Sequence, residues 1–161
     1  MNQTKHTHQA ITVGLLALAT AVLCSAAPQL RIAPADMLTM PHSGGAGTSL
    51  VASMKTTVLA GDPTRPGQYT IRVELPPNTR IQAHSHRDER SAVVVSGIWY
   101  FGYGPKFDAG AMKTLPAGSF YTEPAGEAHF AMTKSEPVVI YITGTGPSST
   151  DYVDPADNPA R

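Results

Sequence analysis

Hydrophobic and polar residues follow a two-residue period in several short segments between residues 48 and 146. In residues 69–75 apolar side chains alternate strictly with polar ones, which is typical of a strand with one buried face. No window shows a sustained helical period, so the pattern predicts an all-β sandwich or barrel. The expected strands are residues 50–59, 69–75, 92–96, 98–101, 119–122, 130–133 and 138–143.

The strands occupy the middle of a chain of 161 residues, a length that fits one domain. Residues 27–47 contain three prolines and a Gly-Gly-Ala-Gly stretch, which predicts an extended arm or linker. The barrel domain is expected at residues 48–146. The chain after Thr143 is rich in Gly, Ser, Asp and Pro, and residues 147–161 are expected to be an irregular tail.

The first 26 residues have the features of a secretory signal peptide. Lys5 lies in a polar start, an apolar run follows at residues 11–23, and small residues end at Ala26. The run is shorter than the roughly 20 residues that a membrane span needs. We therefore expect cleavage before Ala27, a periplasmic or secreted protein, and no membrane span in the mature chain.

The one cysteine, Cys24, lies within the predicted signal peptide. A bulky Leu23 precedes it, which argues against a lipoprotein. Without Cys24 the mature chain has neither a disulfide nor a thiol nucleophile. Lys plus Arg and Asp plus Glu both number 12, so the chain has no basic field for nucleic acid.

His84 and His86 form the first candidate site. Residues two apart in a strand point to the same face, with Cα atoms about 6.6–6.8 Å apart, so both imidazoles can reach one metal ion. The spacing alone is weak evidence, because His6 and His8 repeat it inside the predicted signal peptide.

Two motifs around these histidines resemble the cupin family. Asn78 and Gly97 stand at the two glycine positions that frame the first motif, and Asn is the residue that best replaces Gly where φ is positive. The second motif is matched by Gly118, Pro124, Ala125, Gly126 and His129. The resemblance covers roughly residues 69–143 and implies a jelly-roll β-barrel. It also implies one divalent metal ion (Fe, Mn, Ni, Cu or Zn) on His84, His86 and His129.

The chain departs from the cupin pattern at the fourth metal ligand. Arg90 occupies the position of the usual glutamate, and a guanidinium cannot bind a metal. Glu89 could replace it if the strand bulges, although regular alternation turns Glu89 to the other face, and Asp88 is a weaker substitute. Thr133 stands where the family has an asparagine.

Arg90 has two interpretations from the sequence. It either faces the pocket and binds an anionic substrate, or it forms a structural ion pair with Glu89 or Asp88 at the barrel mouth. Tyr121 is a further candidate for the pocket lining. Both Arg90 and Tyr121 are therefore candidate substrate-binding residues.

Two functions fit these features. One is a metal-dependent enzyme, dioxygenase-like, that acts on an anionic or enolisable small molecule. The other is a non-catalytic module of the cell envelope that binds a metal or a small ligand, which the missing glutamate favours. Similar cupins often pair as homodimers through sheet edges, so a homodimer is an additional expectation.

Overall fold

The computed structural model describes residues 28–42 and 48–161, so the predicted signal peptide lies outside the described residues. The described chain is built mainly of β-strands, as the alternation predicts. The strands are β1 (Lys55–Ala60), β2 (Gly67–Leu75), β3 (Arg80–Ser85), β4 (Arg90–Ser96), β5 (Ile98–Tyr103), β6 (Lys113–Pro116), β7 (Phe120–Glu123), β8 (His129–Met132), β9 (Val138–Gly146) and β10 (Asp151–Tyr152).

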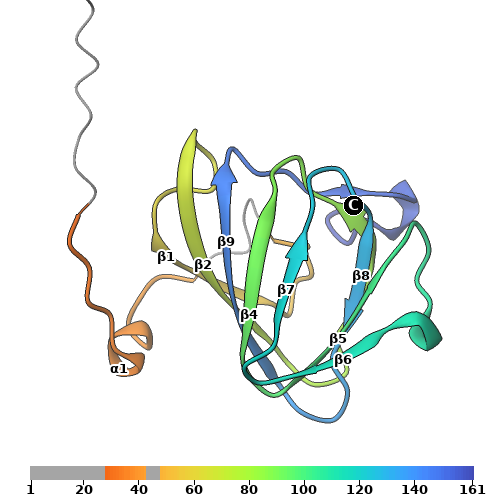
Figure 1. Ribbon diagram of the computed structural model, residues 1–161, viewed down its shortest axis with the longest axis horizontal. Coiled ribbons are helices and arrows are strands. Elements are labelled where there is room, and N and C mark those ends of the chain that lie inside the picture. The colour runs from red at the N-terminus through yellow and green to blue at the C-terminus, as the bar shows by residue number, and fades with distance from the viewer. Residues whose placement is uncertain (1–27, 43–47) are drawn as a thin grey trace, which may run out of the picture.

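The strands form two five-stranded antiparallel sheets that face each other (Figure 1). The first has the order β1-β2-β9-β4-β7 and the second has the order β10-β3-β8-β5-β6. Strands far apart in sequence are therefore neighbours: β2 pairs with β9 along its whole length, from Gly67 opposite Gly146 to Leu75 opposite Val138. The predicted jelly-roll barrel is confirmed.

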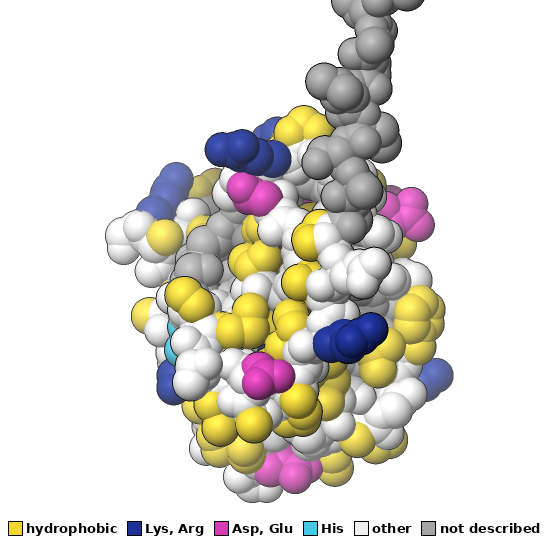
Figure 2. All heavy atoms as spheres, turned by 90° about the vertical axis from the view of Figure 1, so that its left-hand side faces the viewer, with side chains coloured by type: hydrophobic (Ala, Val, Ile, Leu, Met, Phe, Trp, Pro, Cys, Tyr) yellow, Lys and Arg dark blue, Asp and Glu magenta, His cyan; other side chains and the backbone are white. Residues whose placement is uncertain are grey.

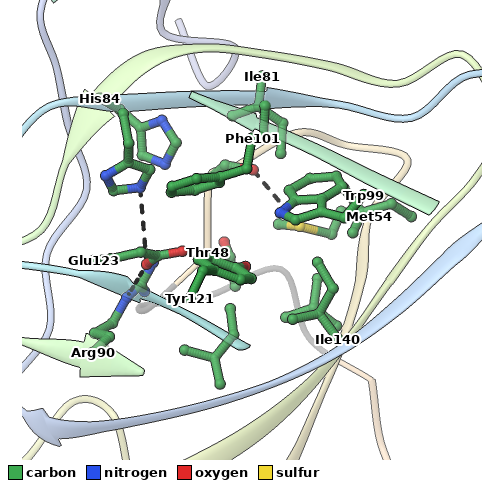
Figure 3. A pocket seen from close by; sticks show the side chains of 16 residues that line it. Thr48, Met54, Ile81, His84, Arg90, Trp99, Phe101, Tyr121, Glu123 and Ile140 are labelled. Carbon is green, nitrogen blue, oxygen red and sulfur yellow. Dashed lines mark hydrogen bonds and ion pairs between the residues drawn. The ribbon is translucent and has the colours of Figure 1, made fainter. Parts of the chain in front are cut away.

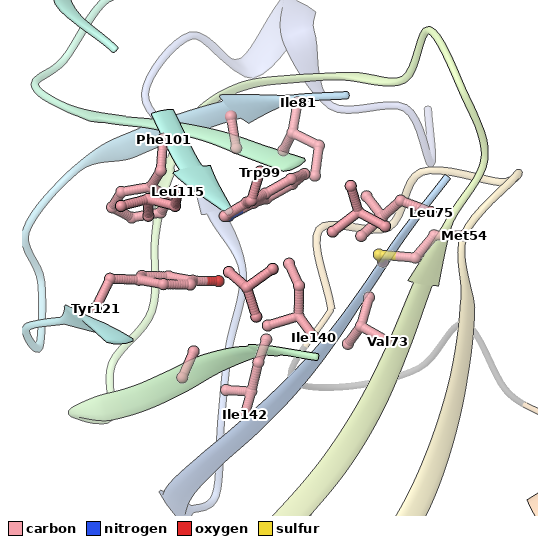
Figure 4. Close-up of a cluster of buried hydrophobic side chains, with 14 of the residues drawn as sticks. Met54, Val73, Leu75, Ile81, Trp99, Phe101, Leu115, Tyr121, Ile140 and Ile142 are labelled. Atoms are coloured by element: carbon pink, nitrogen blue, oxygen red, sulfur yellow. The ribbon is translucent and has the colours of Figure 1, made fainter. Parts of the chain in front are cut away.

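The core lies between the sheets, because alternate residues of each strand point inward. In β2 the inward residues Tyr69, Ile71, Val73 and Leu75 are at most 3% exposed, which reproduces the alternation of the sequence. Residues from the opposite sheet pack against them at one end of the barrel (Figure 4). Figure 4 labels Trp99, Phe101 and Leu115 from the opposite sheet, and Ile140 and Ile142 from β9, the neighbour of β2 in the same sheet.

Two turns hold the backbone conformations that the cupin resemblance implies. Asn78 has φ of +58°, a conformation in which Asn commonly replaces Gly, so this prediction is confirmed. Gly97 has φ of +78°, and a Cβ atom there would lie 2.2 Å from the carbonyl oxygen of Pro137. Only glycine fits at this second position.

The segments outside the predicted barrel also pack on it. In the arm, Met37 at the end of the short helix α1 (Pro34–Met37) is buried, and the hydroxyl of Tyr141 lies 3.4 Å from its sulfur. After residue 146 the predicted irregular tail contains β10, which pairs with β3, and the 3-10 turn η2 (Pro155–Asp157). The backbone N–H of Val153 donates to the carbonyl of Ala83 at 3.0 Å.

The face turned to the viewer in Figure 2 carries Lys and Arg as well as Asp and Glu, scattered around a group of hydrophobic side chains. Among the described residues, no helix is long and apolar enough to cross a membrane.

Candidate metal centre

Three histidine side chains meet inside the barrel. His84 lies near the end of β3 and His129 begins β8, and the two are register partners across the sheet. His86 follows β3 directly. All three are at most 4% exposed, and their ring centroids lie 4.5–5.2 Å apart. His84 and His129 are 45 positions apart in the sequence. The two cupin motifs that contain them thus meet in the folded chain.

The orientation of each imidazole is fixed by the backbone. In all three histidines Nδ1 lies within hydrogen-bond distance of a main-chain carbonyl, which can only accept, so Nδ1 carries the proton. The carbonyls that accept from His84, His86 and His129 belong to Gln82, Ser149 and Glu127, at 2.8, 2.5 and 3.2 Å. Each Nε2 is consequently left with a free lone pair, as a metal ligand requires.

Burial keeps these imidazoles neutral. Desolvation lowers the pKa of His84 to about 3 and that of His86 to about 2, and it also lowers the pKa of His129. The ligand atoms of the three side chains lie within 4.8 Å of one another. Nε2 of His86 and of His129 is fully buried without a hydrogen-bond partner in the described part of the chain. These unpartnered, convergent nitrogens fit a divalent metal ion.

A carboxylate that the sequence interpretation missed lies beside two of the three histidines. Oε2 of Glu123, at the end of β7, lies 3.9 Å from Nε2 of His86 and 3.8 Å from Nε2 of His129. Glu123 is 4% exposed. The alternation in β7 could have revealed it, since an inward Tyr121 places Glu123 on the same face.

Arg90 forms an ion pair with this carboxylate. Arg90 and Glu123 are register partners on β4 and β7, and Arg90 Nε donates to Glu123 Oε2 at 2.6 Å. Arg90 Nη2 contacts the same oxygen (Figure 3). Burial by itself would raise the pKa of Glu123, but the charge of Arg90, with smaller effects of His129 and His86, lowers it to about 2. The carboxylate is therefore ionised.

Of the two interpretations of Arg90, the ion pair with Glu89 or Asp88 is not what the structure shows. Arg90 is 4% exposed and pairs with Glu123 inside the barrel. Asp88 is buried and accepts hydrogen bonds from the hydroxyls of Tyr69 and Ser148, both at 2.6 Å.

Glu89 lies away from the histidines. Its side chain is exposed and lines a surface hollow with residues such as Gln68 and Thr145. The strand alternation is the reason: with Arg90 pointing inward, the preceding residue points outward. A fourth ligand from the described residues is thus available from Glu123 rather than from Glu89.

A cavity of about 40 Å³ lies beside His84, His129 and Glu123 (Figure 3). Tyr121 forms part of its wall, as the sequence suggested, and Phe101 stacks on the His129 ring with centroids 5.4 Å apart. The other lining residues are mostly aliphatic side chains of the core. The space is thus largely apolar, with its charged groups beside the histidines.

Two segments that are far apart in the sequence meet beside the cavity. Thr48 and Ser49 line it, and their carbonyls accept hydrogen bonds from the hydroxyls of Thr150 and Tyr152. The Tyr152 ring also packs on His84, with centroids 5.3 Å apart.

A jelly-roll barrel with three convergent histidines defines a cupin. The chain belongs to the family described as the ChrR cupin-like domain, whose profile matches residues 46–149. No curated protein sequence matches the chain.

Solved structures share the fold at low sequence identity. The polyketide cyclase RemF from Streptomyces resistomycificus is 16% identical over 82% of this chain and 90% of that chain, with a TM-score of 0.65. A sugar phosphate isomerase of the cupin superfamily from Silicibacter pomeroyi is 14% identical over 76% and 81%, with a TM-score of 0.56. A DMSP lyase aligns at 21% identity over 58% of this chain and 48% of that chain, with a TM-score of 0.49. The chain thus spans less than half of that lyase.

Proposed function

We propose that this cupin binds one divalent transition-metal ion and uses it in chemistry on a small molecule, in the manner of a dioxygenase. The observation that carries the proposal is the convergence of three buried, neutral imidazole nitrogens on one point beside an ionised carboxylate. His84, His86, His129 and Glu123 would hold the ion. Three nitrogen ligands and one carboxylate suit Fe, Mn, Ni or Cu, and the same set would hold zinc.

The charges at the site favour an enolisable or anionic substrate. The reason is the charge of the metal ion, and not a free Arg90 as the sequence suggested. Arg90 is engaged by Glu123 and does not present a separate anion site. Its positive charge cancels that of Glu123, so the two positive charges of an ion at the histidines would remain uncompensated inside the barrel. A bound metal would supply Lewis acidity or oxygen activation, and an ionised oxygen of the substrate would offset its charge.

A second function is favoured by the size of the cavity. About 40 Å³ holds roughly three water-sized groups, since each needs about 10–15 Å³. Thr48 and Ser49 line the cavity, and their carbonyls accept hydrogen bonds from Thr150 and Tyr152. A cavity this small also suits a module that stores or presents a metal ion without catalysis.

We further propose that the protein works in the periplasm or outside the cell. The support for this is the sequence of residues 1–26, which has the polar start, apolar run and small residues of a cleavable signal. Expression in a Gram-negative host followed by N-terminal sequencing of the periplasmic fraction tests it. An uncleaved terminus in the membrane fraction would contradict it.

The central test is metal analysis of the mature protein purified without a histidine tag, followed by oxygen uptake with small phenols, keto acids and ketones. We expect about one equivalent of metal per chain and oxygen consumption with at least one substrate class. His129→Ala should lose the metal, whereas His42→Ala, outside both motifs, should keep it. One equivalent of metal without oxygen uptake would favour the binding module. No metal in either protein would overturn both functions.

A further inference from the structure

Two hydrogen-bond donors at the cavity wall have no acceptor. Trp99 on β5 and Tyr121 on β7 are 3% and 7% exposed, and both line the cavity beside the histidines. Nε1 of Trp99 and the hydroxyl of Tyr121 are fully buried without a hydrogen-bond partner among residues 28–42 and 48–161. Figure 4 shows the Tyr121 hydroxyl pointing into the space between Trp99 and Ile140.

The two groups cannot satisfy each other. An indole N–H only donates, so even a bond from Trp99 to the Tyr121 oxygen would leave the Tyr121 proton without an acceptor. Burial raises the pKa of Tyr121 well above its usual value, so the hydroxyl keeps that proton. By contrast Tyr69, also fully buried, donates to Asp88 at 2.6 Å. The barrel thus provides a hydrogen-bond acceptor for the buried Tyr69 but none for Tyr121 among the described residues.

An unsatisfied buried donor costs folding free energy. A ligand that enters the cavity with a hydrogen-bond acceptor would therefore be bound favourably by these two donors. The charged groups near it are already paired, since Arg90 donates to Glu123. The cavity that the two donors line also has aliphatic walls, which include Val73, Leu75 and Ile140. This environment suits a neutral oxygen on a small apolar body, because an anion away from the metal would lose its hydration without gaining a cation.

We propose that Trp99 and Tyr121 bind the carbonyl oxygen of a small neutral ketone or aldehyde in the cavity. The inference rests on the proposed function and deepens it, because it names the substrate class of the same site. The cavity of about 40 Å³ limits the part of the ligand enclosed there to a few non-hydrogen atoms. A carbonyl compound of this kind is enolisable and so agrees with the charge balance at the histidines.

Trp99 provides a direct reporter, since it is the one tryptophan of the chain. The ¹⁵N-labelled mature protein, loaded with zinc, gives a single indole N–H signal in a proton–nitrogen NMR spectrum. Acetone and 2-methylpropene are the probes, because both are neutral and similar in size and shape, but only acetone has an oxygen that can accept a hydrogen bond. We expect acetone at millimolar concentrations to move the indole signal in a saturable way, and 2-methylpropene to move it much less.

The variants test the role of the hydroxyl. Tyr121→Phe should weaken acetone binding about threefold to tenfold, the effect of one neutral hydrogen bond, while the zinc content stays at one equivalent. Tyr100→Phe is the matched control, because its ring lies on the other side of β5, with Lys134 over it, and it should bind acetone like the parent.

An indole signal that acetone does not move, or moves equally in Tyr121→Phe, would overturn the inference, and so would an equal response to 2-methylpropene. These results leave zinc binding intact and so differ from failure of the proposed function. That failure would appear as a protein that takes up no zinc.

Discussion

The carboxylate at the candidate metal centre comes from a different strand than the cupin pattern predicts. Arg90 and Glu123 are directly opposite on antiparallel strands, where side chains on one face lie about 4.5–5.5 Å apart at Cβ. A cation at the usual ligand position therefore faces a carboxylate on its neighbour. Like the usual cupin site, this one has one carboxylate beside the histidines. Unlike it, the carboxylate is paired with a buried arginine.

Glu123→Gln tests whether this carboxylate is a ligand. The amide keeps the shape but loses the charge, so we expect metal affinity to fall by at least tenfold to a hundredfold. Glu89→Gln is the control, because Glu89 is exposed and should not affect the metal. Competition titrations with a chromophoric zinc chelator measure both. A larger loss in Glu89→Gln than in Glu123→Gln would show that the ligand has been assigned to the wrong residue.

Arg90→Gln tests what the cation does for the fold. Without Arg90 the ionised Glu123 would be buried beside two neutral imidazoles, and removal of one partner of a buried pair typically costs about 3–5 kcal/mol. We expect that loss in the free energy of unfolding of the metal-free protein, measured in urea. Zinc should restore part of it, because the ion would replace the missing positive charge. Arg87→Gln, at an exposed position, should change little.

At the scale of elements, the periodic segments were predictable and the short or aperiodic ones were not. Residues 69–75 alternate over seven positions and lie within β2, whereas β10 has two residues and carries no periodicity. Glu123 was missed because the second motif has no carboxylate at that position. The packing of Met37 on Tyr141 could not be predicted either, because a contact between distant segments produces no local sequence pattern.

The C-terminal segment has a role at the site that its composition does not reveal. The Ser149 carbonyl fixes the proton of His86, and Tyr152 packs on the His84 ring. We expect a chain that ends at Ser148 to bind metal about tenfold to a hundredfold more weakly, because residues that orient metal-binding imidazoles commonly contribute that much. A chain that ends at Asp154 keeps both contacts and should bind like the full protein. Equal affinities for the two truncated chains would exclude this role for residues 149–152.

At the scale of the whole molecule, the site is held by distant parts of the chain and is therefore organised only in the folded state. The candidate ligands come from β3, β7, β8 and the turn after β3, and these strands lie in both sheets. Metal binding would then be coupled to folding. Zinc at a free concentration of 100 times its Kd would add about 2.7 kcal/mol to the free energy of unfolding.

The same burial makes the metal-free protein sensitive to acid. The pKa values of His84 and His86 are lowered to about 3 and about 2, and that of His129 is also lowered, while unfolded histidines titrate near 6.5. Below about pH 6.5 the unfolded chain binds protons that the folded chain excludes, so stability is full above that pH and falls as the pH decreases. His84 and His86 should each remove about 1.4 kcal/mol between pH 7.5 and 5.5, and the lowered pKa of His129 should add to this loss.

Urea unfolding of the metal-free protein at pH 7.5, 6.5 and 5.5 measures this loss, which should total at least about 2.7 kcal/mol, the sum for His84 and His86. His129→Ala removes one imidazole that excludes a proton in the folded state, so its loss over the same range should be smaller than that of the parent. His42→Ala should follow the parent, since His42 lies in the arm and bonds to Thr57 outside the cavity. Equal losses in the parent and in His129→Ala would mean that His129 titrates normally in the folded protein. In that case His129 would not be held as a neutral, ready ligand.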